Sequence, residues 1–219
     1  GQPIVTIEML DKFDLGQEFF QWEFATALAG SILGINAFDQ PNVQESKDIT
    51  NKLLSRPVGQ MTQEKPIFTE GLLSFYSRET LKQFLKRAAP GDYIALMAFL
   101  PELPTTTELL QSIRKNLRDK LRLATTLGYG PRFLHSTGQL HKGGPNTGLF
   151  LQLTADDSSD ISIPDRPYTF GIFKQAQAQG DLETLHKHQR RALRIHLGKN
   201  ADKGLKELSE LLNNILRSW

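Results

Sequence analysis

The sequence of 219 residues contains no cysteine. This absence excludes disulfide bonds, thiolate metal sites and cysteine nucleophiles. It also fits a reducing compartment, so we expect a cytoplasmic protein. Metal chemistry would have to rely on the five histidines and on carboxylates. We expect neither a metal nor an organic cofactor.

Long apolar runs and a charge excess are lacking as well. No stretch approaches the roughly 18 to 20 uninterrupted apolar residues of a membrane span, and the N-terminus does not have the layout of a signal peptide. Lys and Arg total 26 against 24 Asp and Glu, without a basic run of five or more. We therefore expect no membrane and no nucleic-acid partner.

An initiator methionine is also missing, because the chain opens with Gly1-Gln2-Pro3. We expect a chain that is processed or cut from a longer polypeptide. With 39% hydrophobic residues in 219, the chain is long enough for one large domain or two small ones.

The spacing of apolar residues predicts alternating strands and helices. Strands are predicted at 4–9, 93–100, 132–135, 149–154 and 192–197. Helices are predicted at 14–32, 43–54, 77–88, 105–128, 169–179 and 201–216, and three of them begin with capping-box spacing at Asp14, Asn42 and Thr105. This alternation indicates an α/β fold, a layered α-β-α sandwich with a mainly parallel, Rossmann-like sheet. In residues 57–76, Pro, Gly and Gln interrupt every periodicity, so we expect a connecting stretch between residues 1–56 and 77–219.

The segment from residue 36 to 47, with the sequence NAFDQPNVQESK, is the most informative motif. It resembles the C-terminal signature of phosphoglucose isomerases, in which Phe-Asp-Gln is followed by Gly-Val-Glu and by a lysine seven residues after the glutamine. Gln40 and Lys47 hold that spacing. Asn42 replaces the usual glycine, and Gln44 replaces the usual glutamate, which removes one carboxylate. The resemblance covers residues 3–54, and the sequence of this variant motif is similar to that of the bifunctional transaldolase–phosphoglucose isomerases.

This resemblance implies a sugar-isomerase (SIS) type of fold, with residues 1–56 as the C-terminal segment of the isomerase domain. It implies that Gln40 contacts the substrate and that Lys47 assists opening of the sugar ring. The reaction would be interconversion of glucose 6-phosphate and fructose 6-phosphate through a cis-enediol. The physical chemistry agrees, because a helix that begins near Val43 directs free N–H groups and its positive dipole end towards a phosphate. The alternative is an ordinary turn followed by a solvent-exposed lysine.

A catalytic base is missing from this motif. In the family it is a glutamate upstream of the signature, whereas upstream of Gly16 this chain has only Glu8, Asp11 and Asp14. Enediol chemistry needs such a base. We therefore expect the chain to be inactive alone and to act with the upstream part of its polypeptide or with a partner in a homo-oligomer.

Residues 133–144 form a second cluster, in which a predicted strand ends in a loop of small residues with His and Lys. Small residues let backbone N–H groups approach an oxyanion. We predict that His135, Ser136, Thr137 and Lys142 bind the phosphosugar. The cluster also resembles the stretch of the isomerases that bears the catalytic base. Either residues 77–219 form a second sugar-isomerase-like unit, or this similarity is accidental. The alternative is a buried strand histidine followed by a flexible glycine loop.

Other conspicuous side chains have simpler explanations. His186 and His188 are two residues apart and do not face one another on a helix, so we expect them to be solvated. We expect His196 to be a satisfied core residue and the aromatic group of residues 19–24 to be helical core. Three functions stay open: a part of an isomerase, a non-catalytic phosphosugar-binding module, and a structural appendix that stabilises a fusion or an oligomer.

Overall fold

The computed structural model describes residues 4–39, 41–56 and 65–217, with the side chains of residues 41–43 excepted. The chain divides into two units, residues 1–40 and residues 41–219. The boundary between the units lies at residue 40, not in the expected connecting stretch at 57–76, because helix α2 (Pro41–Leu54) packs with the rest of the second unit. Residues 57–64 lie outside the described residues.

The first unit contains one helix, α1 (Asp14–Leu33), within its described residues. The strand predicted at residues 4–9 is wrong, since this segment is exposed and no described strand pairs with it. The predicted capping box is wrong as well. Asp14 is the first helical residue, and its carboxylate accepts hydrogen bonds from the preceding N–H groups of Leu10 and Asp11, both at 2.9 Å. The helix ends at Leu33, and the next residue, Gly34, has a φ of 67°, which favours glycine.

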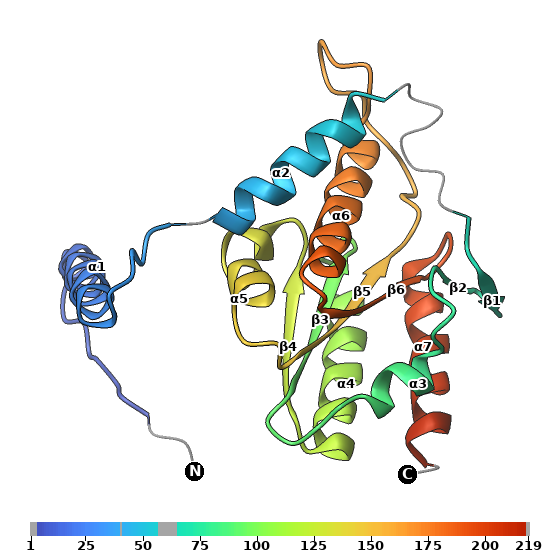
Figure 1. Cartoon of the computed structure of the whole chain (residues 1–219), viewed down its shortest axis with the longest axis horizontal. Helices are drawn as coiled ribbons and strands as arrows, with labels where there is room; N and C mark the ends of the chain where they lie inside the picture. Colours follow the sequence, from blue (N-terminus) through green and yellow to red (C-terminus); the bar gives the residue numbers. More distant parts are fainter. Residues whose placement is uncertain (1–3, 40, 57–64, 218–219) are drawn as a thin grey trace. The chain divides into compact units, whose positions relative to one another are not determined.

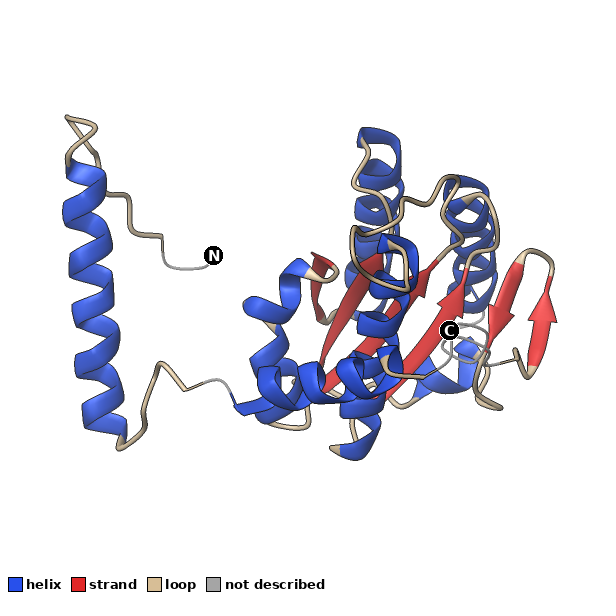
Figure 2. Ribbon diagram, turned by 90° about the horizontal axis from the view of Figure 1, so that it is seen from above, coloured by secondary structure: helices blue, strands red, loops and turns tan. Residues whose placement is uncertain are grey.

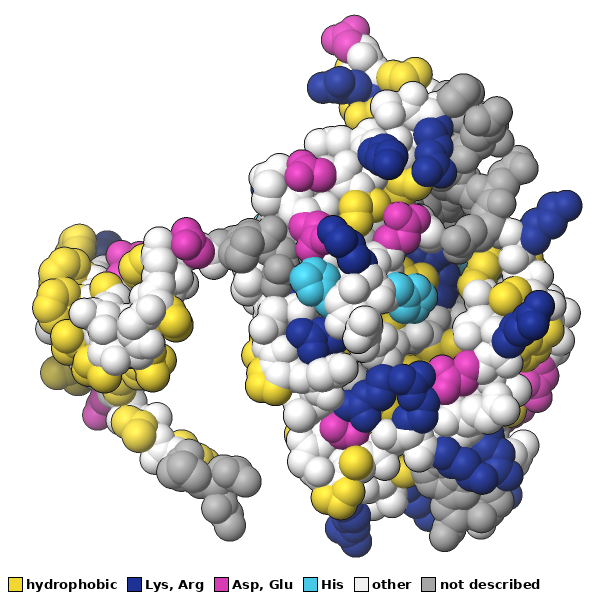
Figure 3. Space-filling view, viewed as in Figure 1, with side chains coloured by type: hydrophobic (Ala, Val, Ile, Leu, Met, Phe, Trp, Pro, Cys, Tyr) yellow, Lys and Arg dark blue, Asp and Glu magenta, His cyan; other side chains and the backbone are white. Residues whose placement is uncertain are grey.

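Large apolar side chains surround α1 and are exposed (Figure 3). They include the aromatic group at residues 19–24, which is therefore not the core of this unit. The group comprises Phe19, Phe20, Trp22 and Phe24. Among the described residues, no helix is both long and apolar enough to cross a membrane.

The second unit is an α/β layer structure built on a sheet of six strands in its described part. The strand order is β1-β2-β6-β5-β3-β4, in which β4, β3, β5 and β6 are parallel, while β1 and β2 form an antiparallel hairpin beside β6. The strands are β1 (Phe68–Glu70), β2 (Leu73–Phe75), β3 (Tyr93–Phe99), β4 (Ala124–Tyr129), β5 (Gly148–Thr154) and β6 (Arg191–His196).

Helices cover both faces of this sheet (Figures 1 and 2). Besides α2, the helices are α3 (Leu81–Lys86), α4 (Pro104–Leu121), η2 (Arg132–His135, a 3-10 helix), α5 (Gly138–Gly143), α6 (Phe170–Lys187) and α7 (Ala201–Arg217). The mostly parallel sheet between helical layers confirms the predicted Rossmann-like sandwich.

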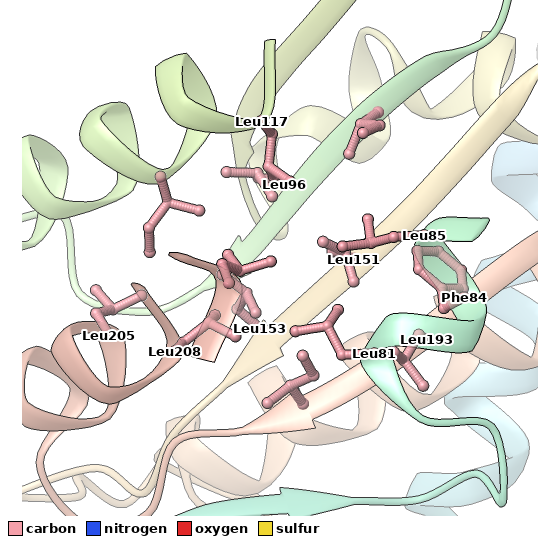
Figure 4. Close-up of a cluster of buried hydrophobic side chains, with 14 of the residues drawn as sticks. Leu81, Phe84, Leu85, Leu96, Leu117, Leu151, Leu153, Leu193, Leu205 and Leu208 are labelled. Carbon is pink, nitrogen blue, oxygen red and sulfur yellow. The ribbon is translucent and has the colours of Figure 1, made fainter. Parts of the chain in front are cut away.

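The central strand β3 divides the core by strict alternation. Ile94, Leu96 and Ala98 point into a leucine-rich cluster with α3, α4 and α7, part of which is drawn in Figure 4. Ala95 and Met97 point into a second cluster with η2 and α6. Because both faces are covered, the strand is apolar throughout, as parallel central strands usually are.

Several boundaries differ from the sequence prediction. Helix α4 ends at Leu121, not near residue 128, because Arg122 takes a left-handed conformation with φ 57° and the chain then forms β4 beside β3. Residues 132–135 form η2, not a strand, because β4 already occupies this sheet edge and Phe133 and Leu134 are buried in a short turn. The hairpin β1–β2 lies in the expected connecting stretch. Helix α3 begins after Thr80, which forms a capping box with Gln83, rather than after residue 77.

Candidate functional site

Lys47 lies on the exposed side of α2. The helix begins at Pro41 and runs to Leu54, close to its predicted bounds. Proline suits a first helical position, because the N–H that it lacks would have no partner inside the helix. Gln40, the predicted substrate contact, lies outside the described residues. Lys47 is therefore placed to meet a ligand from solvent, within the second turn of the helix.

The opposite side of α2 is fixed to α6. The Glu45 carboxylate binds the Lys187 ammonium and, at 2.7 Å, Nε2 of His188. Hydrogen bonds from these two side chains hold the pKa of Glu45 below its usual value. His188, which we expected to be solvated, thus has a carboxylate partner.

The second predicted cluster is divided by the structure. His135, the last residue of η2, is exposed, and so are Ser136 and Thr137, which connect η2 to α5. Lys142 is instead 1% exposed, because the expected loop forms α5 and turns this residue inwards. Helix α5, which follows residues 135–137 in the chain, packs against α2, the helix that carries Lys47.

Lys142 forms a buried ion pair with Asp181 of α6. Its ammonium lies 2.6 Å from Oδ1 of Asp181, and both side chains are 1% exposed. Complete burial raises the pKa of Asp181, against the opposing effect of Lys142. Arg190 donates from Nε to the Lys142 carbonyl oxygen at 3.1 Å. Lys142 therefore fastens α5 to α6, and its ammonium does not face the surface with His135.

His141 lies beside Lys142 in an aromatic environment. Its ring centroid is 5.0 Å from that of Phe150, 6.0 Å from that of Phe133 and 6.1 Å from that of Tyr93. Burial, with a smaller effect of the Lys142 charge, lowers the pKa of His141 to about 4. The imidazole is therefore neutral near pH 7.

Polar groups also gather at the carboxyl ends of β5 and β6. His196 is hydrogen-bonded through Nδ1 to Oγ1 of Thr154 at 3.1 Å, and its Nε2 lies 3.4 Å from Oδ1 of Asp156. The pKa of His196 is lowered by burial, while Asp156 raises it in part. The next residue, Asp157, pairs with Lys174 of α6. These groups can form hydrogen bonds with a polar ligand. They lie at the carboxyl ends of the strands, where α/β proteins bind ligands.

Sequence reasoning did not identify Asp156, Asp157 or Asp181. The first two lie two and three residues after the end of the buried strand β5, which is a usable signal for a ligand-binding site. Asp181 carried no such signal, since a charged residue in a helix is normally expected to face solvent.

A groove of about 630 Å³ lies at the opposite edge of the sheet, where the chain enters β3 and β4. It contains none of the predicted site residues. Its lining includes the cationic side chains of Lys86, Lys120 and Arg122. Among the described residues, no group of three or more His, Asp and Glu side chains is placed to hold a metal ion.

Comparison with protein-family models gives no match. Curated glucose-6-phosphate isomerases match the chain over a short stretch. The identity is 39% over 51 residues for the probable glucose-6-phosphate isomerase of Methanococcus maripaludis, 39% over 54 residues for that of Shouchella clausii, and 40% over 53 residues for that of Streptococcus equi subsp. zooepidemicus. These stretches are 23 to 25% of this chain and 12% of each relative.

Among solved structures, the chain is similar in fold to a hypothetical protein from Thermus thermophilus, with a TM-score of 0.54 and 14% sequence identity. The likeness covers 82% of this chain and 45% of that protein. The chain is thus related in sequence to glucose-6-phosphate isomerases over only about a quarter of its length in each match, and it shares an α/β fold with the Thermus protein.

Proposed function

We propose that this chain carries the lysine-bearing helix of a glucose-6-phosphate isomerase active site. The observation that carries the proposal is the match of 51 to 54 residues to three such isomerases. The exposed position of Lys47 on α2 supports it, because a ring-opening lysine has to reach a substrate from solvent.

In this proposal Lys47 donates a proton or a hydrogen bond to the ring oxygen of the sugar, and Gln40 contacts the substrate. Ring opening breaks the bond between the anomeric carbon and the ring oxygen, and the anomeric hydroxyl releases its proton to solvent as the carbonyl forms. A base then moves the proton between C2 and C1 through a cis-enediol. The base comes from the upstream part of the polypeptide or from a partner copy. His135, Ser136 and Thr137 are exposed and offer hydrogen bonds to the phosphosugar. We leave Lys142 out, since its ammonium is paired with Asp181 inside the fold.

The test is Lys47→Ala in the full-length protein, compared with Lys52→Ala. Lys52 is an exposed lysine on the same helix, so its loss removes the same charge without touching the proposed site. We expect Lys47→Ala to lower kcat by at least about tenfold and Lys52→Ala to leave it unchanged. Circular dichroism should show both variants folded. Normal turnover of glucose 6-phosphate by Lys47→Ala would refute the assignment.

A second candidate is a non-catalytic phosphosugar-binding or structural module fused to a transaldolase. One observation favours it: each match to an isomerase covers only 23 to 25% of the chain. If Lys47→Ala keeps full activity, or the full-length protein has no isomerase activity, this second function is supported.

A further inference from the structure

Helices α2 and α6 pack along each other in antiparallel directions (Figure 1). Near the start of α2, Glu45 meets Lys187 and His188 at the end of α6. At the other end, Leu53 and Leu54 share a buried cluster with Ala176. The two helices are therefore in contact over most of the length of α2.

The middle of this contact is unusually close. A Cβ atom at Gly180 would lie 2.7 Å from Oγ1 of Thr50 and 3.2 Å from the carbonyl oxygen of Ser46. Oγ of Ser46 lies 3.2 Å from Oγ1 of Thr184, and both side chains are buried. A side chain larger than that of glycine at position 180 would therefore require the Thr50 side chain or α2 itself to shift.

Ser46 directly precedes Lys47, so the tightest part of the contact lies beside the proposed catalytic lysine. The Lys47 side chain itself stays exposed. Any shift or rotation of α2 on α6 would therefore be transmitted to the Lys47 ammonium. Misplacement of a catalytic group by about 1 Å can cost as much as a hundredfold in rate.

We propose that α6 positions the Lys47 helix, with Gly180, Thr184 and the Glu45 ion pairs as positioning residues. This gives the α/β unit a role in the isomerase reaction, although α6 itself contains no residue of the segment assigned to catalysis. The inference rests on the proposed function of Lys47. It adds that residues 77–219 act on catalysis through the orientation of α2.

The first test is Gly180→Leu in the full-length protein, which forces a side chain into the contact. We expect kcat to fall by about tenfold or more, with a smaller change in KM. The matched control on the same helix is Glu183→Gln, an exposed residue hydrogen-bonded to Gln179 of α6, and it should leave kcat unchanged. Hydrogen exchange should show that β3 and β5 remain protected in Gly180→Leu.

The second test separates an effect on the position of α2 from an effect on the folding of the chain, because both states are compared in the same variant. Glu45→Gln removes the ion pairs with α6, and Ser46→Cys with Thr184→Cys adds two thiols that face each other in a chain without cysteine. We expect the triple variant to have a low kcat when reduced and to regain several-fold of it when the disulfide closes. The same oxidation should leave kcat of Glu45→Gln alone unchanged.

These outcomes distinguish the inference from the function on which it rests. If Lys47→Ala is inactive while Gly180→Leu and the reduced triple variant match the wild type, the positioning role is wrong and the proposed function stands. If Lys47→Ala is fully active, the proposed function fails. If the disulfide does not form, the packing of α2 on α6 is contradicted, and the inference fails with it.

Discussion

The buried imidazole of His141 should make the stability of the α/β unit depend on pH. Its folded-state pKa is about 4, against an ordinary value of 6.5. Between these values the unfolded chain binds a proton that the folded chain does not, so the free energy of unfolding falls as pH falls from 6.5 towards 4. The difference in pKa corresponds to a loss of about 3 kcal/mol, which is a large part of the stability of a typical domain.

The measurement is urea unfolding at a series of pH values from 7 to 4, followed by far-UV circular dichroism. His141→Leu keeps a side chain of similar size in the aromatic environment and should lack this pH-dependent loss. His135→Gln is the matched control, because His135 is exposed and lies only six residues earlier, and it should retain the wild-type slope. Parallel curves for the wild type and His141→Leu would refute the reasoning.

Two further predictions concern the ion pair and the isolated chain. Lys142→Met and Asp181→Leu should each lower the free energy of unfolding in urea by about 3 to 5 kcal/mol, since each leaves a buried charge unpaired. The double variant should lose less than either single variant. Losses that are equal and additive would contradict a buried pair. Purified residues 1–219 should fold but show no isomerase activity in a coupled assay with fructose 6-phosphate, since loss of a general base alone lowers the rate by about 10² to 10⁴. Turnover by this chain that is abolished by Lys47→Ala would contradict the prediction.

The sequence predicted the α/β class because segments with helical periodicity alternate with short apolar runs. The apolar runs that became β3 and β5 have no alternation, which is typical of strands buried on both faces. The strand β4 was missed for the opposite reason. Its sequence, ATTLGY, is short and only partly buried, and it follows an amphipathic helix closely enough to be taken for its last turns.

The candidate site was predictable only where local sequence determines exposure. Lys47 is exposed because it lies on the polar side of an amphipathic helix, and its spacing from Gln40 is visible in the sequence. The inward position of Lys142 depends on a partner 39 positions later, Asp181, and on α5 forming where glycines suggested a loop. Such long-range pairing leaves no local pattern.

Gly180 has a consequence for the intrinsic stability of α6. A glycine inside a helix costs about 0.5 to 1 kcal/mol relative to alanine. In a chain shortened to remove α2, Gly180→Ala should therefore stabilise α6, whereas in the intact unit the same methyl group meets Thr50 and should oppose docking. The sign of the stability change caused by Gly180→Ala thus reports whether α2 is packed on α6. Helix formation in α6 is therefore thermodynamically linked to the presence of α2.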